Sequence, residues 1–279
     1  SHIRAPVPPS VASSTLTRPP RSPHFPDTTL FRSASPLHAS DGLSFDAERI
    51  RDRSEVEIDP ASAYILVETD LFANIEFVKE ATPLERAIWE QQRLKAISQA
   101  AEDGAGEAID AENFPWPAAE SQLRLRMEVN GHFERKRDFV LYLYRVPVGT
   151  YTFYAHNTYN TQDCACMGTV SFPVVAGRIT ALRIEREYLG PAGEVLAERP
   201  RKGTALERLM RTAIKVSPPT ALAYDERLPS GSFQAADLTP VPELPNWWRY
   251  IVNRILPLEG LFSYDRDTMV VEAPTNGKE

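Results

Sequence analysis

The sequence contains little cysteine, no long apolar run and no excess of positive charge. Its 279 residues include two cysteines, Cys164 and Cys166, which are too few for a disulfide framework. No stretch of about 18 consecutive apolar residues occurs, so no membrane-spanning helix is expected. The net charge is −7 and no basic stripe is present, so nucleic acid is not expected as a partner, because an acidic surface repels phosphate.

Common catalytic motifs are also missing. The chain has no G-x-S-x-G nucleophile elbow, no phosphate-binding P-loop and no H-E-x-x-H metal motif. We therefore expect no enzyme active site and no cofactor. Hydrophobic residues make up 42% of the chain and charged residues 25%, which is typical of globular proteins, so a buried core is expected.

Proline is abundant, with 24 residues, and many lie near the N-terminus. Residues 1–55 are polar and irregular and are predicted to be disordered, because they cannot bury enough apolar surface to offset their ordering entropy. The segment 25–33 resembles one translated reading frame of a widely used sequencing adapter at eight of nine positions. We therefore interpret residues 1–33 as an artefact and exclude them from fold reasoning. Under this interpretation, the missing apolar signal sequence says nothing about export.

The remaining sequence predicts an α+β protein with an antiparallel β-sandwich core in residues 56–190. Segments rich in β-formers or alternating in polarity are predicted to be strands. They are 64–69, 73–78, 123–129, 139–144, 150–154, 167–175 and 178–186. Asn130-Gly131 is predicted to close a hairpin between two of them, because both residues tolerate positive φ.

One long helix is predicted within this core, over residues 83–102. Thr82 and Glu85 have the spacing of a capping box, and Pro83 suits the first helical position. The apolar face of this helix is expected to comprise Leu84, Ile88, Leu94, Ile97 and Ala101.

Residues 203–279 are predicted to pack back on the sandwich as a helical and irregular C-terminal segment. Helices are expected over 204–215 and 246–256, and a closing strand over 264–271.

Two predicted turns share one pattern, in Val146–Phe153 and in Val174–Ala181. Each has a glycine turn followed by an apolar residue two places later and a threonine at the third. The first, Val-Pro-Val-Gly-Thr-Tyr-Thr-Phe, resembles the strand-turn-strand of prealbumin-like, carboxypeptidase-regulatory-like β-sandwich domains. The stretch 139–186 resembles uncharacterised proteobacterial envelope proteins and lipoproteins, as do residues 59–78 and 245–267. The resemblance implies export to the periplasm or cell envelope and no established reaction.

The two cysteines are candidate site residues. On a strand, Cys164 and Cys166 would face the same way with their Cα atoms about 6.5–7 Å apart, so a disulfide between them would need a turn. Two thiolates on one face could instead hold a metal, with His156 or Asp163 as further ligands, although the spacing is not that of a zinc finger. Plain buried thiols are a third alternative. A nucleophilic pair of either cysteine with His156 lacks a third, orienting group.

A second candidate site lies on the predicted helix 246–256, where Trp247, Trp248 and Ile251 share an apolar face. Tryptophan is enriched at membrane interfaces, so this helix could contact a membrane or partner surface. The alternative is a helix that covers an open face of the sandwich.

Three functional hypotheses follow from the sequence. The first is a non-catalytic binding or structural module of the bacterial cell envelope, with an unknown ligand or envelope protein as partner. The second is a metal- or redox-linked protein that uses Cys164 and Cys166 with His156. The third is a membrane-surface protein anchored by helix 246–256.

Overall fold

A computed structural model gives the fold of this chain. It describes residues 43, 45–51, 56–70, 73–103, 110–128, 130–135, 139–158, 161–190, 194–197, 212–219, 225–264 and 271–272. These residues all belong to one compact unit, 41–279. The adapter-like segment and residues 204–211 of one predicted helix lie outside the described residues.

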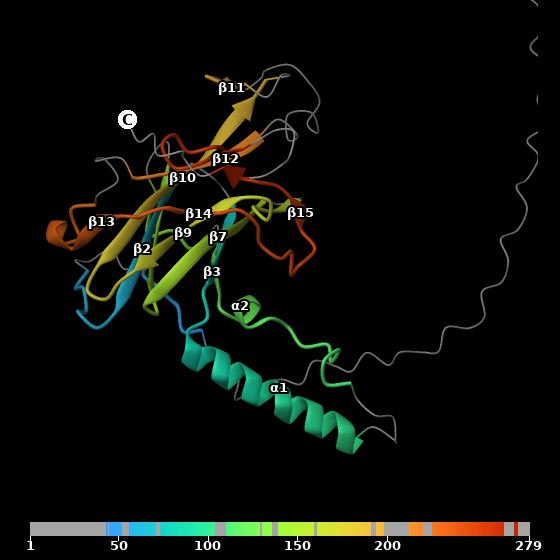
Figure 1. The fold of residues 1–279 in the computed structure, drawn as a ribbon. Coiled ribbons are helices and arrows are strands. Elements are labelled where there is room, and N and C mark those ends of the chain that lie inside the picture. The colour runs from blue at the N-terminus through green and yellow to red at the C-terminus, as the bar shows by residue number, and fades with distance from the viewer. Residues whose placement is uncertain are drawn as a thin grey trace, which may run out of the picture. The chain divides into compact units, whose positions relative to one another are not determined.

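The described chain is mostly β-structure, arranged in two large sheets (Figure 1). The first sheet has the order β1 (Glu48–Arg49), β6 (Val140–Val146), β2 (Ala63–Thr69), β10 (Ile179–Leu189) and β11 (Val195–Leu196). Additional strands of this sheet are β12 (Thr212–Ser217) and β13 (Phe233–Ala235), both paired with β10, and β5 (Glu134–Arg135), paired with β6. Strand β1 lies within residues 1–55, for which the sequence predicts disorder.

The second sheet has the order β14 (Thr239–Val241), β9 (Thr169–Val174), β7 (Gly149–Thr158), β3 (Asn74–Lys79) and β4 (Arg124–Met127). Strand β8 (Thr161–Cys164) pairs with β7, and β15 (Ile251–Val252) pairs with β8. Two short strands, β16 (Ser263–Tyr264) and β17 (Val271–Glu272), pair only with each other in the described chain, where one continuous strand was predicted. The remaining elements are α1 (Pro83–Asp103), α2 (Ala119–Gln122) and a 3₁₀ turn, η2 (Ser230–Ser232).

The sheets are mixed, so the prediction of a purely antiparallel core is wrong. Strand β2 runs parallel to β10, and β13 and β15 also run parallel to their partners. The periodicity of apolar residues reports which face of a strand is buried, and it carries no information on strand direction.

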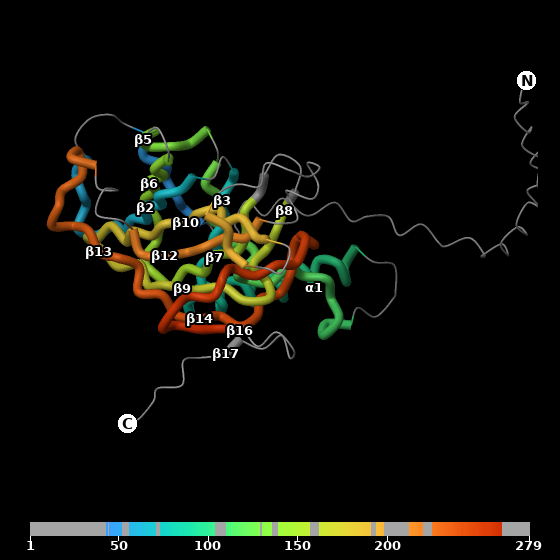
Figure 2. The backbone as a smooth tube through the Cα atoms, turned by 90° about the horizontal axis from the view of Figure 1, so that it is seen from above, coloured from blue at the N-terminus to red at the C-terminus, as the bar shows by residue number. Residues whose placement is uncertain are grey.

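The predicted hairpin at Asn130-Gly131 is also wrong. The Gly131 amide does donate to the Glu128 carbonyl, at 2.7 Å, but β4 on one side of this turn belongs to the second sheet and β5 and β6 belong to the first. The two glycine turns that share a pattern likewise connect the sheets, from β6 to β7 and from β9 to β10. Figure 2 shows β2, β6 and β10 on one side and β7, β9 and β14 on the other.

Buried side chains of both sheets form one shared core. Ile65 and Tyr142 from the first sheet belong to the same cluster as Phe77, Phe153 and Phe172 from the second. The Phe77 ring meets the other two rings edge-on, with centroids 5.9 and 5.7 Å apart. The core therefore lies between the sheets, and the outer face of the second sheet is available for other packing.

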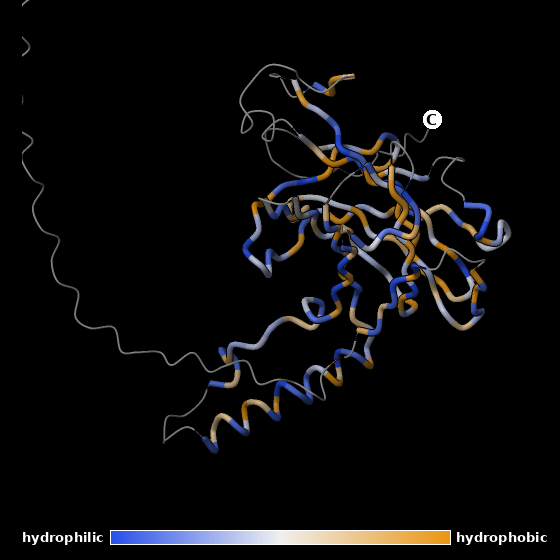
Figure 3. The backbone as a smooth tube through the Cα atoms, turned by 180° about the vertical axis from the view of Figure 1, so that it is seen from behind, coloured by the Kyte–Doolittle hydropathy of each residue, from blue (hydrophilic) through white to orange (hydrophobic). Residues whose placement is uncertain are grey.

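Helix α1 begins where the sequence predicts. The Glu85 carboxylate accepts from the Thr82 amide at 2.8 Å, and the Thr82 hydroxyl accepts from the Glu85 amide at 3.2 Å, which confirms the capping box. The apolar face expected from the sequence is not a buried face, because Leu84 is 70% exposed and Leu94 is also exposed. Figure 3 shows apolar residues recurring along α1, although Ala96 is its one buried residue.

Both predicted C-terminal helices need correction. Residues 212–217 form strand β12, whose residues Ala213, Ile214 and Val216 are buried beside β10. Residues 246–256 form turns and strand β15 instead of a helix. No helix in the described ranges has the length and apolar character needed to span a membrane.

A candidate binding surface over a buried disulfide

Cys164 and Cys166 form a disulfide bond, which decides between the alternatives that the sequence leaves open. Cys164 ends strand β8, and the chain turns directly after it, so the two Cα atoms lie 5.1 Å apart. This is closer than an extended chain allows for residues two apart, and it falls within the usual range for a disulfide. Both residues are buried.

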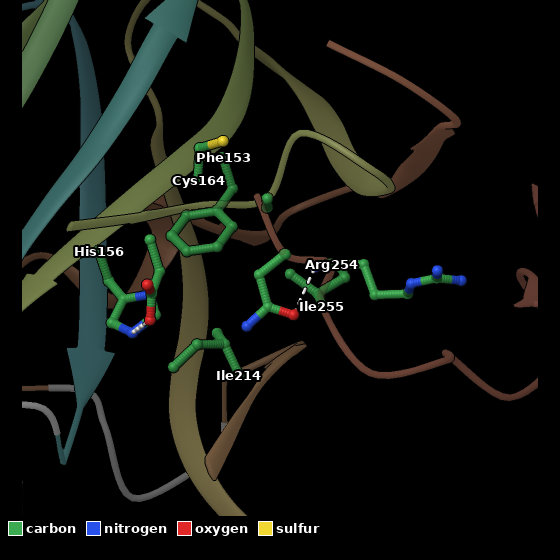
Figure 4. A pocket seen from close by; sticks show the side chains of 9 residues that line it. Phe153, His156, Cys164, Ile214, Arg254 and Ile255 are labelled. Carbon is green, nitrogen blue, oxygen red and sulfur yellow. Dashed lines mark hydrogen bonds and ion pairs between the residues drawn. The ribbon is translucent and has the colours of Figure 1, made fainter. Parts of the chain in front are cut away.

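His156 and Asp163, which the sequence suggests as metal ligands, line a small hollow together with Cys164 (Figure 4). The His156 Nε2 atom is 3.6 Å from an Asp163 carboxylate oxygen. The hollow measures about 180 Å³ including space open to solvent, and its water-accessible part has room for about one water molecule. Within the described residues, no group of three His, Cys, Asp or Glu side chains is placed to hold a metal ion.

The electrostatics of this hollow keep His156 neutral at physiological pH. Burial, reinforced by the positive charge of Arg186, lowers the pKa of His156 to about 4. Burial also raises the pKa of the nearby Asp163 carboxyl group. Because the sulfur atoms of both cysteines are bonded to each other, neither is a thiolate that His156 could activate.

The titration of His156 predicts a pH dependence of stability. Its pKa is lower in the folded chain than in the unfolded chain, so its contribution is complete above about pH 6.5 and is lost as the pH falls toward 4. We expect a loss of roughly 1–3 kcal/mol in the free energy of unfolding across this window. In the His156→Gln variant, the free energy of unfolding from urea titrations should change less between pH 6.5 and pH 4. His132→Gln is the matched control and should keep the pH dependence of the unmodified chain. An unchanged pH profile in His156→Gln would contradict this assignment.

A C-terminal strap, defined here as residues 244–255, covers the disulfide. The Leu244 amide donates to the Cys166 carbonyl at 2.9 Å, and the Asn253 amide donates to the Cys164 carbonyl at 2.8 Å. In the reverse direction, the Met167 amide donates to the Asn253 carbonyl at 3.0 Å. The strap is therefore held at both cysteines by backbone hydrogen bonds.

Aromatic rings of the strap pack on Tyr154 of β7. The Trp247 ring stacks on it at 5.3 Å with an interplanar angle of 19°, and the Trp248 ring meets it edge-on at 4.8 Å. The Tyr154 hydroxyl accepts from the Trp247 amide and donates to the Pro245 carbonyl, both at 3.1 Å. Tyr154 is thus the ring that positions both tryptophans.

A buried charge pair lies beneath these rings. Glu76 on β3 is fully buried, and one of its carboxylate oxygens accepts from Arg124 on β4 at 2.5 Å. The Tyr250 hydroxyl donates to the same carboxylate at 3.3 Å. The Arg124 guanidinium also lies 4.2 Å from the centre of the Trp248 ring, a cation–π contact. Each tryptophan is therefore held on one side by a group from the second sheet.

We call residues 246–252 the aromatic loop. The Asn246 side chain holds both backbone groups of Tyr250, donating to its carbonyl at 2.7 Å and accepting from its amide at 2.8 Å. Arg249 has a φ of +56°, a left-handed conformation that is uncommon outside glycine. Beyond this turn, Ile251 is 60% exposed and Val252 is 46% exposed. The loop thus has a defined shape that presents apolar side chains to solvent.

Sequence reasoning found part of this surface and missed the rest. It identified Trp247, Trp248 and Ile251, which the structure does bring to one loop, with the tryptophans half-buried and Ile251 exposed. It missed Glu76, Arg124 and Tyr250, whose positions depend on contacts between distant segments. One signal was available in the sequence: Glu76 and Arg124 are opposite charges at polar positions of two alternating strands, so they could pair on the same face of a sheet.

Comparison with protein-family models, with curated proteins and with solved structures finds no match to this chain. The fold and the site therefore define a class only: a mostly β protein of two mixed sheets with an aromatic surface backed by a disulfide.

Proposed function

We propose that this chain is an exported, non-catalytic binding module of the bacterial cell envelope, with a prealbumin-like β-sandwich fold. The observation that carries the proposal is the buried Cys164–Cys166 disulfide beneath the rigid aromatic loop. Disulfides persist in oxidising compartments such as the bacterial periplasm and are rare in the cytosol. Backbone conformations such as that of Arg249 concentrate at functional sites.

The strand order supports the sandwich part of this proposal. One sheet contains the run β6-β2-β10-β12 and the other contains β4-β3-β7-β9. The chain crosses repeatedly between the sheets, which is typical of Greek-key sandwiches. The shared core and the glycine turns between sheets agree with the sequence resemblance to prealbumin-like domains.

The chemistry of the surface supports binding over catalysis. The aromatic loop presents stacked rings, aliphatic side chains and one exposed arginine. Aromatic and arginine side chains contribute much of the binding energy at protein interfaces. The adjoining hollow is far smaller than the roughly 300–1,000 Å³ of typical small-molecule sites. A metal- or redox-linked role for the cysteines would require the buried disulfide to open.

The state of the cysteines tests this proposal. We expect the full chain, directed to the periplasm by an added signal sequence, to contain no thiol that reacts with a maleimide reagent in denaturant. Reduction in denaturant should reveal two thiols, detected as a mass shift. The double variant Cys164→Ser/Cys166→Ser should lose only about 1–2 kcal/mol in the free energy of unfolding, because the loop that the disulfide closes is short.

The control is the single variant Cys164→Ser, which should show one reactive thiol under the same conditions. Two reactive thiols in the exported chain, or one zinc ion bound per chain, would overturn the proposed role of the disulfide.

A further inference from the structure

We propose that the aromatic loop, residues 246–252, docks on a lipid bilayer that carries anionic headgroups. This inference rests on the proposed function, because it takes the loop to be the binding surface of the module. It differs from the sequence hypothesis of a membrane-surface helix, since the contacting element is a rigid loop at the edge of a sheet.

The side chains of the loop match the chemistry of a membrane interface. Ile251 and Val252 are adjacent, large and exposed, and they follow two half-buried tryptophans. Tryptophan and tyrosine favour the headgroup level of a bilayer, while aliphatic side chains enter the boundary with the acyl chains. A bilayer can therefore accommodate all of these side chains without a protein partner.

The loop is already ordered, so docking would lose little conformational entropy. Asn246 fixes the backbone of Tyr250, and Tyr154 and Arg124 fix the two tryptophan rings. The disulfide and the backbone hydrogen bonds of the strap hold this arrangement from below. Ile251 and Val252 therefore stand on a rigid support.

Charge complementarity indicates which bilayer the loop would bind. The chain has 38 acidic residues, yet residues 244–258 contain none and include Arg249 and Arg254. Arg249 is exposed, and the side chain of Arg126, 45% exposed, lies 3.9 Å from the Glu76 carboxylate beneath the loop. Because the rest of the chain is acidic, an anionic bilayer would orient the chain with this surface toward the headgroups.

Flotation with lipid vesicles tests the inference on the full chain with its disulfide intact. Vesicles of phosphatidylcholine alone are compared with vesicles that also contain phosphatidylglycerol. We expect at least tenfold stronger binding to the anionic vesicles, weakened by salt, with a blue shift of tryptophan fluorescence. The double variant Ile251→Thr/Val252→Thr should bind about tenfold more weakly, because threonine retains the strand preference and removes apolar surface.

Matched controls separate the loop from the general surface. Val148→Thr/Val195→Thr changes two exposed valines elsewhere, 48% and 54% exposed, and should bind like the unmodified chain. In Arg249→Asn, the asparagine can adopt the left-handed conformation at this position. The variant should bind about fivefold more weakly, because it lacks one basic residue near the anionic surface. Lys95→Gln, at an exposed position on α1, should leave binding unchanged.

Several outcomes would overturn the inference. The first is that the chain binds neither kind of vesicle, and the second is that the loop variants bind as well as the unmodified chain. The third is that the chain binds soluble dextran sulfate whether or not Ile251 and Val252 are replaced. Association of two copies through the loop in the absence of lipid would also overturn it. Each of these results, in a chain whose two cysteines remain bonded, leaves the proposed envelope function standing, whereas reactive thiols in the exported chain would remove that function.

Discussion

Replacing Arg124 by alanine should lower the free energy of unfolding by about 3–5 kcal/mol and disorder the aromatic loop. The variant leaves the Glu76 carboxylate fully buried and without its 2.5 Å charged partner. The Tyr250 hydroxyl and the more distant Arg126 cannot replace a direct ion pair, because a buried charge needs close compensation. The cation–π contact that holds the Trp248 ring is lost at the same time.

The double variant Arg124→Met/Glu76→Gln is the matched control. It removes both charges while retaining volume, so it should recover most of the lost stability. Urea denaturation followed by far-UV circular dichroism gives the stability, and near-UV circular dichroism reports the order of the tryptophans. Equal stability of Arg124→Ala and the double variant would show that the buried charge is not the cause.

Replacing Glu85 by alanine should destabilise the fold to a similar extent, by about 3–5 kcal/mol, because it isolates a buried ammonium group. The Lys79 side chain is 1% exposed, and its amino group donates to the Glu85 carboxylate at 2.6 Å. The remaining contact, to the Glu80 carbonyl, is longer at 3.4 Å. The same carboxylate caps α1 through the Thr82 amide, so the variant also removes one end of the capping box.

The pH dependence separates these two roles of Glu85. Burial alone would raise its pKa, but the hydrogen bonds from Lys79 and Thr82 outweigh burial and lower the pKa below its ordinary value of 4.5. A lowered pKa contributes stability that is present above pH 4.5 and is lost as the pH falls through the folded-state value. Glu85→Gln keeps a side-chain oxygen that can accept the Thr82 amide, and it should lack this acid-sensitive part of the stability. Glu90→Gln, elsewhere on α1, should retain it.

The double variant Lys79→Met/Glu85→Gln completes the comparison. It should be more stable than Glu85→Ala, because it buries no unpaired charge. Thermal unfolding at pH 7 and at pH 4 measures both effects. A chain in which Glu85→Ala unfolds at the same temperature as the unmodified protein would exclude the buried pair as a source of stability.

Local rules predicted the start of helix α1 and the main strands correctly, but they failed at the Asn130-Gly131 turn and at both C-terminal helices. The capping box of Thr82 and Glu85 and the start of α1 depend on residues within one helical turn, so the sequence contains all the information needed. The strands β2, β3, β6, β7, β9 and β10 follow from β-forming residues and alternation. The exposure of Leu84 could not be predicted in the same way, since periodicity shows that a face is apolar without showing what covers it.

The strap shows why the site needed more than the sequence. The spacing of Trp247, Trp248 and Ile251 suits a helix as well as a loop. The outcome was decided by groups more than 75 residues away: the Tyr154 ring, the carbonyls of Cys164 and Cys166, and the Arg124–Glu76 pair. Pairing with the edge of β8 satisfies backbone groups of the strap, and ring stacking adds stabilisation that an isolated short helix would lack.

The sequence by itself determined the main strands, the capped start of helix α1, two closely spaced cysteines and an apolar, tryptophan-containing C-terminal segment. Composition and periodicity suffice for these features, because they depend on neighbouring residues. Only the tertiary structure decided that the sheets are mixed, that glycine turns carry the chain between them, and that the cysteines bond beneath a rigid aromatic loop. These features arise from contacts between segments far apart in the chain, whose energies depend on burial and geometry that no local pattern encodes.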